Sequence, residues 1–418
     1  MKRIRVMTED LRLLAISYAY LPDSFPRSIQ VARLLAALPV KTTLLCAEDF
    51  EAQKDDTIAP LNITADVNVI RQPFRIRFFL KILRRLHQHL GISFFLKQPD
   101  PCIFWLPKAW KAAKELVLNE QPDVITTFGM PMSDHILGLL LKKHFKLPWI
   151  AHFSDPWTDN PYIQFNTATG WTNRKLESMV MNNADAILFT NQETVSLVME
   201  KYPDHIRKKA MVLPHAYAPD RYSSQSNDDM DIIRHIGAFY GLRTPIPFLN
   251  AVQSLQKKKP ELFDTIRFEF VGPIENRLQD KTQKDWSSSE LVSFLPPVDY
   301  QESLNLMASA KALLLIDAPM ETSPFFPSKL ADYIGSGKPI FSITPNGPAK
   351  RIIQEYNLGL TVDTRDDTQI EKALEQFLTE VKEGISYSPP DDFQAETVAR
   401  EFKSIIQSVL KPNINEAR

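Results

Sequence analysis

The segment SPFFPSKLADYIGSGKPIFSI, residues 323–343, carries a spacing that suits phosphate binding. Ser328 and Lys329 follow a loop rich in Pro and Phe, where a helix is expected to begin. A helix start presents unpaired N–H groups and a partial positive charge, which attract an anion. Lys329 would add a full charge, and Asp332, one turn further, could accept a hydrogen bond from a sugar hydroxyl. The alternative is that Ser328 only caps the helix and Lys329 is solvated.

The length and composition predict a two-domain globular protein. The chain has 418 residues, more than one hydrophobic core usually supports. Its net charge of −1 gives no reason to expect a nucleic-acid partner. Its two cysteines, Cys46 and Cys102, are too few for a cysteine-based metal site and fit a reducing compartment. We find no signal-peptide pattern and no apolar run long enough for a bilayer span, so we expect a cytoplasmic protein.

Short apolar runs alternate with helical patterns along the whole chain, which predicts parallel βαβ units. Strands are expected at 11–18, 41–47, 123–129, 148–154, 186–190, 210–216, 232–239, 267–272, 291–298, 312–318 and 359–364. Helices are expected at 28–38, 134–145, 171–183, 192–202, 247–257, 300–309, 367–382 and 392–411.

A polar, turn-rich stretch at 218–231 interrupts this alternation and is expected to be a linker. The domains would then be 1–217 and 232–391, with a terminal segment, 392–418, that returns as a helix to the first domain. The expected fold class is α/β, with two doubly wound, Rossmann-like domains. Such sheets bind ligands at the carboxyl ends of their strands.

Several segments, in order, resemble the GT-B glycosyltransferases of the family 4 type (glycosyltransferase group 1). PSKLADYIGSGKPIFSI is similar to the segment in which a Lys and an acidic residue precede a small-residue turn and a strand. The other similar segments are LPDSFPRSIQVARLLAAL, PWIAHFSDPW, NADAILFTN, MVLPHAYAPDRY and IRHIGAFYGLRTPIPFL. Together they cover roughly residues 11 to 390, and the resemblance implies two domains that face a central cleft.

The resemblance implies a retaining, metal-independent transfer of a sugar from a nucleotide-diphosphate sugar, without a cofactor. The donor site would lie in the second domain. Arg243 and Lys329 would be catalytic, because departure of a nucleoside diphosphate builds negative charge that fixed cations stabilise. Further donor-binding candidates are Gly237, Glu275, Ser328 and Asp332.

One position departs from the family pattern. The family places two glutamates eight positions apart; here the second position is Asp332 and the first is Pro324. Glu321 is the candidate substitute for the missing carboxylate. Whether the departure abolishes catalysis stays open in the sequence.

The acceptor would bind the first domain. Asp155, expected at the end of a strand, is the candidate ligand or base for the acceptor hydroxyl, and therefore the third catalytic candidate. Additional acceptor or cleft candidates are Arg27, Ser28, His152, Trp157 and His215. Alternatively Ser28 is a helix cap, Asp155 caps a local turn and Trp157 packs in the core.

Residues 71–97 carry seven Lys or Arg and no acid, interleaved with Phe, Leu and Ile. A basic amphipathic helix of this kind can lie on an anionic membrane surface. It would suit a peripheral protein at the inner face of the plasma membrane that elongates a polysaccharide or glycolipid precursor. The alternatives are a surface helix that packs on its own domain, or a basic groove for a lipid-linked acceptor.

Three other readings remain. DDMD, residues 228–231, matches a metal signature of another glycosyltransferase fold, but a solvated linker explains it better. A sugar-nucleotide epimerase shares the two-domain fold and needs no acceptor. A non-catalytic GT-B partner subunit would explain both the missing glutamate and the absence of glycine from the first loop, DSFPRS at 23–28.

Overall fold

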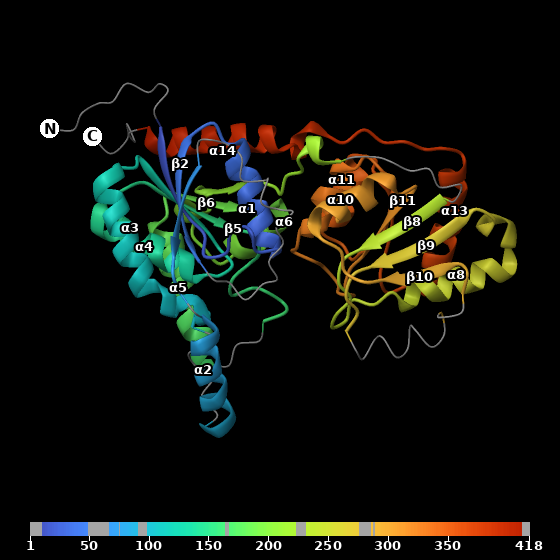
Figure 1. Cartoon of the computed structure of the whole chain (residues 1–418), viewed down its shortest axis with the longest axis horizontal. Helices are drawn as coiled ribbons and strands as arrows, with labels where there is room; N and C mark the ends of the chain where they lie inside the picture. The colour runs from blue at the N-terminus through green and yellow to red at the C-terminus, as the bar shows by residue number, and fades with distance from the viewer. Residues whose placement is uncertain are drawn as a thin grey trace. The chain divides into compact units, whose positions relative to one another are not determined.

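The structure is a computed structural model, and it describes residues 11–48, 67–74, 76–90, 98–163, 167–222, 231–275, 286 and 289–411. The chain divides into two compact units (Figure 1). The first comprises Met1–Pro214 and Ala395–Arg418, and the second comprises His215–Gln394.

The first unit is built on a seven-stranded parallel sheet in the order β3-β2-β1-β4-β5-β6-β7. Its strands are β1 (Arg12–Ile16), β2 (Lys41–Ala47), β3 (Val67–Gln72), β4 (Val124–Phe128), β5 (Trp149–Phe153), β6 (Ala186–Phe189) and β7 (Ala210–Val212). Its α-helices are α1 (Pro26–Ala37), α2 (Ile76–Leu90), α3 (Leu106–Glu120), α4 (Ser133–Phe145), α5 (Thr167–Asn183), α6 (Gln192–Met199), α7 (Asp204–Arg207) and α14 (Ala395–Leu410). The terminal helix α14 packs against α1.

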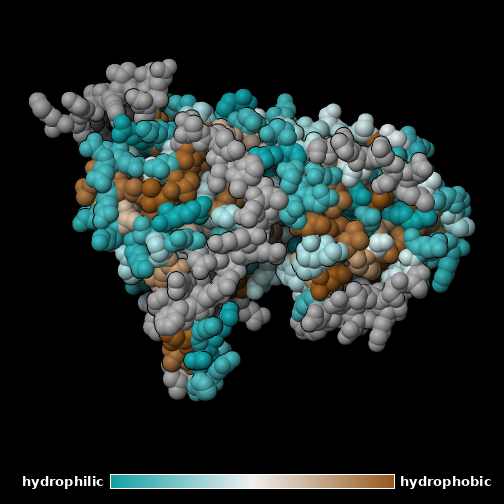
Figure 2. Space-filling model, in the orientation of Figure 1, coloured by the Kyte–Doolittle hydropathy of each residue, from teal (hydrophilic) through white to brown (hydrophobic). Residues whose placement is uncertain are grey.

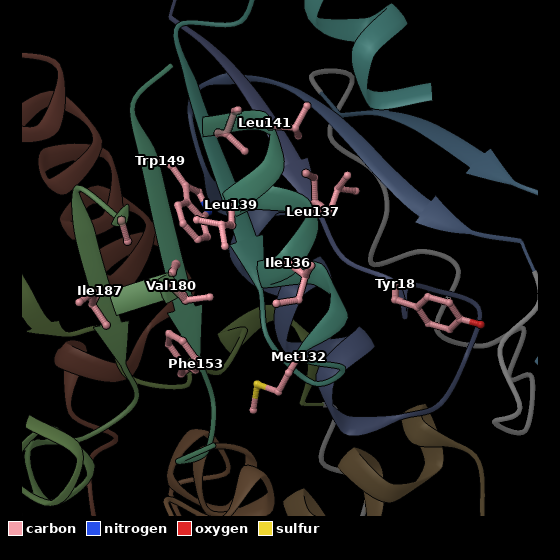
Figure 3. Close-up of a cluster of buried hydrophobic side chains, with 14 of the residues drawn as sticks. Tyr18, Met132, Ile136, Leu137, Leu139, Leu141, Trp149, Phe153, Val180 and Ile187 are labelled. Carbon is pink, nitrogen blue, oxygen red and sulfur yellow. The ribbon is translucent and has the colours of Figure 1, made fainter. Parts of the chain in front are cut away.

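The core of the first unit lies between its central strands and the helices that connect them (Figure 3). Strands β4 and β5 are buried at every position, because both faces of a parallel sheet are covered by helices. Leu137 and Leu141 of α4 belong to this cluster together with Trp149 of β5. The indole N–H of Trp149 donates to the Thr127 hydroxyl at 3.0 Å, so this buried donor is paired.

The second unit contains a six-stranded parallel sheet in the order β10-β9-β8-β11-β12-β13. Its strands are β8 (Asp231–Ile236), β9 (Ile266–Val271), β10 (Val292–Leu295), β11 (Ala312–Ile316), β12 (Ile340–Ile343) and β13 (Gly359–Val362). Its α-helices are α8 (Ile246–Lys258), α10 (Tyr300–Ser309), α11 (Ser328–Gly335), α12 (Pro348–Glu355) and α13 (Asp367–Lys382). Short 3₁₀ helices at Pro101–Trp105, Pro219–Arg221, Pro260–Phe263 and Asp391–Phe393 complete the two units.

Each sheet contains one point where the strand order reverses. In the first unit it lies between the neighbouring strands β1 and β4, and in the second between β8 and β11. Loops that leave such neighbours turn to opposite sides of the sheet, and the crevice between them is where open α/β sheets bind ligands. Two doubly wound, Rossmann-like units confirm the α/β fold class expected from the sequence.

Candidate functional site

In the second unit, two glycines bring the ends of neighbouring strands together. Gly237 follows β8 with φ +142°, and Gly272 follows β9 with φ +133°. A Cβ at Gly272 would lie 2.6 Å from the carbonyl oxygen of Gly237, closer than carbon and oxygen can approach. The N–H of Gly237 also donates to the carbonyl of Val271 at 2.8 Å. The start of the loop after β8 is therefore fixed against the neighbouring strand.

Lys329, in the first turn of α11, lies directly against this loop. A Cβ built at Gly237 would be 2.4 Å from the Lys329 Nζ, so the ammonium occupies the space that the glycine leaves free. The Nζ is also 3.3 Å from His235 Nε2. His235 Nδ1 is 2.9 Å from the carbonyl oxygen of Leu314, which can only accept. Nδ1 therefore carries the proton, and Nε2 accepts from Lys329.

Arg243 reaches the same place from the other end of the loop. Its Nη2 donates to Asp317 Oδ1 at 3.1 Å, and its guanidinium lies over the Tyr240 ring at 5.2 Å. Asp317 directly follows β11, and its other carboxylate oxygen accepts from the Thr344 hydroxyl at 2.9 Å. Two basic side chains and one carboxylate thus meet at the β8/β11 reversal point.

Burial and neighbouring charge lower the pKa of Lys329 and that of His235. The pKa of Lys329 falls to about 7, first because of burial and then because of the Arg243 charge, while Asp317 opposes the change. Burial and the Lys329 charge hold the pKa of His235 well below its usual range, so this imidazole is neutral. Lys329 is therefore a cation that a bound anion would stabilise.

Helix α11 begins at Ser328, one residue earlier than it would if Ser328 were the cap. Pro327 is the N-cap residue and makes no side-chain capping bond, and Ser328 is the first helical residue. Ser328 as the cap is thus wrong, because the preceding proline already adopts the non-helical cap conformation. Asp332, 6% exposed, accepts from the Tyr300 hydroxyl at 3.0 Å.

The two other carboxylates considered for this site lie elsewhere. Glu275 accepts from the N–H of Gly241 at 2.9 Å, so it holds the loop between Gly237 and Arg243. Glu321 is exposed, and its charge acts on Arg365. The carboxylate that contacts Arg243 is that of Asp317.

In the first unit, Arg27 is a buried cation at the start of α1, beside the β1/β4 reversal point. It is 3% exposed, and its Nη2 contacts His152 twice, at 2.6 Å from Nδ1 and 3.0 Å from the carbonyl oxygen. A guanidinium cannot accept, so His152 Nδ1 must be unprotonated. Ser28 is fully buried as a helical residue, and Phe25 occupies the N-cap position, so Ser28 as the helix cap is wrong.

Two carboxyl groups lie within electrostatic reach of Arg27. Burial raises the pKa of Asp155, and the Arg27 charge opposes the rise. Asp134, in the first turn of α4, is fully buried, and burial likewise holds its pKa well above the usual range. One Asp134 oxygen accepts from the N–H of Tyr18 at 2.8 Å. A carboxyl group with raised proton affinity next to a fixed cation is a common arrangement in functional sites.

The loop that carries Asp155 is held by α5. The Trp157 indole N–H donates to Asn173 at 2.9 Å, and the N–H of Thr158 donates to Glu177 at 2.8 Å. Trp157 is 3% exposed and belongs to the core cluster, as the packing alternative expects. His215 belongs to the second unit, where its ring lies 5.3 Å from that of Phe326.

Among the described residues, no group of His, Cys, Asp or Glu side chains is arranged to hold a metal ion. Asp228 and Asp229 of the DDMD segment lie outside the described residues. Asp231 begins β8 and is 3.1 Å from Lys311. This acidic residue therefore lies at the amino end of the sheet, opposite the Arg243 and Lys329 side chains.

Sequence reasoning missed Asp317, His235 and Asp134. For Asp317 a signal existed, because it directly follows the apolar run ALLLI at 312–316, where a buried strand ends. His235 lies inside a strand, and Asp134 inside an expected helix, where polar residues are more often structural. Only the contacts in the folded chain distinguish these residues from polar residues with a purely structural role.

Comparisons with known proteins agree on the fold. No protein-family model matches the sequence, and no curated protein does. Among solved structures, Anabaena HepE in complex with UDP has TM-score 0.62 and 13% identity, over 96% of this chain and 100% of that one. The catalytic domain of Arabidopsis thaliana starch synthase IV, bound to ADP and acarbose, has TM-score 0.63 and 11% identity, over 96% and 100%. A UDP-N-acetylglucosamine 2-epimerase has TM-score 0.58 and 12% identity, over 94% and 95%. The chain therefore has the GT-B fold.

Proposed function

We propose that this chain is a retaining glycosyltransferase that moves a sugar from a nucleotide-diphosphate sugar to a polysaccharide or glycolipid precursor, without a metal. The observation that carries the proposal is the placement of Arg243 and Lys329 around Gly237 at the β8/β11 reversal point. Loss of a nucleoside diphosphate concentrates negative charge on the leaving oxygens. Preorganised cations in a half-buried site stabilise that charge far better than water does.

The second unit would bind the donor. The diphosphate would contact Lys329, Arg243 and the N–H groups at the start of α11, which has no side-chain cap. Asp332, already fixed by Tyr300, is close in sequence to this helix start and would accept from the ribose. HepE, solved in complex with UDP, and the starch synthase domain, bound to ADP, support a nucleotide as the ligand of this fold.

The first unit would bind the acceptor. Asp155, whose pKa is raised by burial, would accept the proton of the attacking hydroxyl. Arg27 and His152 would fix the local charge and orientation beside it. The clamp of Trp157 and Thr158 on α5 would keep the Asp155 loop in one position.

A sugar-nucleotide epimerase is the second candidate, because a UDP-N-acetylglucosamine 2-epimerase has the same fold at a similar TM-score. Both enzymes need a nucleotide site, so nucleotide binding alone does not separate them. Conversion of a nucleotide sugar into its epimer, with no acceptor present, would favour the epimerase. A non-catalytic subunit would give neither product.

The first test is nucleotide binding. We expect one of UDP-glucose, GDP-mannose, dTDP-glucose or ADP-glucose to bind in calorimetry. Lys329→Ala and Arg243→Ala should each weaken that binding at least tenfold, about 1.4 kcal/mol, because each removes a charge-assisted contact to phosphate. Lys311→Ala is the matched control, since this lysine precedes β11 at the opposite end of the sheet. Binding that survives both substitutions, or that fails for all four donors in the folded wild type, would refute the proposed donor site.

The exposed side chains of helix α2 support the proposal that the acceptor is associated with a membrane. The helix protrudes from its unit and shows an apolar and a hydrophilic side (Figures 1 and 2). Ile82 and Leu86, one turn apart, are 42% and 38% exposed, and Lys81, Arg84 and Arg85 are exposed beside them. Within the described part of the chain, no helix is long and apolar enough to cross a bilayer. We propose that α2 lies on the surface of an anionic membrane.

Vesicle sedimentation tests this surface. We expect binding to vesicles with about one third phosphatidylglycerol and little binding to pure phosphatidylcholine. Each base near an anionic surface contributes about 1 kcal/mol, so Arg84→Gln combined with Arg85→Gln should lower the partition coefficient at least tenfold. Lys142→Gln and Lys143→Gln on α4 are the matched controls. Equal sedimentation of the α2 double variant and the wild type would refute the proposal that α2 binds a membrane surface.

A further inference from the structure

Asp317 occupies a position that no sequence motif assigned. It follows β11 at the reversal point of the second sheet and is 8% exposed. Both of its carboxylate oxygens have a partner: Oδ1 accepts from Arg243 at 3.1 Å, and Oδ2 accepts from Thr344 at 2.9 Å. Its own N–H donates to the carbonyl of Ile343 at 2.9 Å. The carboxylate is therefore fixed from β12 as well as from β11.

The charges around Asp317 explain why a carboxylate stands there. Lys329 is faced by His235 from β8, by Arg243 from the loop after β8 and by Asp317 from β11. The Arg243 charge disfavours the charged form of Lys329, and the Asp317 charge favours it. Among the described residues, Asp317 is the ion-pair partner of Arg243. Without it, two half-buried cations would repel each other with no compensating charge.

We propose that Asp317 is a positioning residue of the phosphate site, which fixes the Arg243 guanidinium and supplies the negative charge that offsets Arg243 and Lys329. The distance between Arg243 and Asp317 in the sequence is 74 residues, so the pair depends on the fold. The Thr344 hydroxyl orients the carboxylate and leaves Oδ1 toward Arg243.

The inference deepens the proposed donor site, and it can be tested without a nucleotide. Competitive labelling of the full chain with acetic anhydride, read by mass spectrometry across pH 5.5–10, gives the pH at which Lys329 becomes half reactive. Asp317→Asn removes the charge but keeps the size of the side chain. Because Asp317 raises the pKa of Lys329, we expect this half-point to move to lower pH by at least about half a unit. Asp317→Glu, which keeps the charge, should leave it near the wild-type value.

Glu321→Gln is the matched control, because it removes an exposed carboxylate that acts on Arg365. A half-point that is the same in Asp317→Asn and the wild type would overturn the inference. A loss of thermal stability without that shift would indicate a structural role only, and would overturn it equally. Failure of the wild type to bind any nucleotide sugar, with the shift present, would instead refute the proposed function and leave the charge pairing of Asp317 standing.

As a second readout, Asp317→Asn should lower nucleotide-sugar affinity at least threefold at pH 7.5, since Lys329 is then less often charged and Arg243 is no longer held. Asp317→Glu should recover most of that loss. An unchanged affinity in Asp317→Asn, together with a shifted half-point, would contradict the role assigned to the charge in phosphate binding.

Discussion

Replacement of Gly237 by alanine is expected to lower nucleotide-sugar affinity about 100-fold, or about 2.7 kcal/mol. The new Cβ would lie 2.4 Å from the Lys329 Nζ and 3.0 Å from its Cε. The flexible lysine end can move away more easily than the backbone, so the clash would displace the ammonium from the site. The φ of +142° also strains any residue with a side chain, which would shift the loop that ends at Arg243. Both cations would then be misplaced.

Gly241→Ala is the matched control for this prediction. Gly241 lies in the same loop with φ +60°, and nothing lies within 4 Å of a Cβ built there. Alanine should cost about 1 kcal/mol of stability for its left-handed conformation and change affinity less than about twofold. Isothermal calorimetry, with circular dichroism to verify folding, measures both variants. Equal affinity of Gly237→Ala and Gly241→Ala would show that the space beside Gly237 is not part of the donor site.

The affinity for a nucleotide sugar is expected to fall by about 25-fold between pH 6.5 and 8.5, if the charged form of Lys329 is the one that binds. The sign follows from the pKa of Lys329, which burial lowers to about 7 in the free protein. Below that pH the ammonium is present and attracts the diphosphate. Above it the free protein must first take up a proton, which costs binding free energy. The diphosphate of a nucleotide sugar is a diester and does not titrate in this range.

The same argument predicts proton uptake. At pH 8, calorimetry in two buffers of different ionisation enthalpy should show close to one proton taken up for each nucleotide sugar bound, and almost none at pH 6. Lys329→Met should bind weakly and show neither the pH dependence nor the proton uptake. A flat affinity across pH 6.5–8.5 in the wild type would show that Lys329 does not contact the diphosphate.

The sequence predicted the fold class because local periodicity carries that information. Alternating apolar runs and helical patterns gave most strands of both sheets. The edge strand β3 (Val67–Gln72) was missed, because its half-exposed positions lack a continuous apolar run. Helices α3 and α12 received no prediction, since each follows a proline-rich or polar stretch that resembles a loop. Helix starts were displaced where proline or phenylalanine took the cap position in place of Ser328 and Ser28.

The sequence by itself also determined that Lys329 stands at a helix start after a buried strand. It did not place Gly237 in the loop with Arg243, because the expected strand 232–239 included Gly237, whereas β8 ends at Ile236. The tertiary structure alone decided which of these groups meet. Arg27 and His152 are 125 residues apart, and Arg243 and Asp317 are 74 apart, yet each pair is in contact. The reason is physical: a parallel sheet gathers the carboxyl ends of its strands at one edge, and strand order decides which ends are neighbours. Strand order depends on the packing of the whole core, and the local spacing of residues along the sequence does not specify that packing.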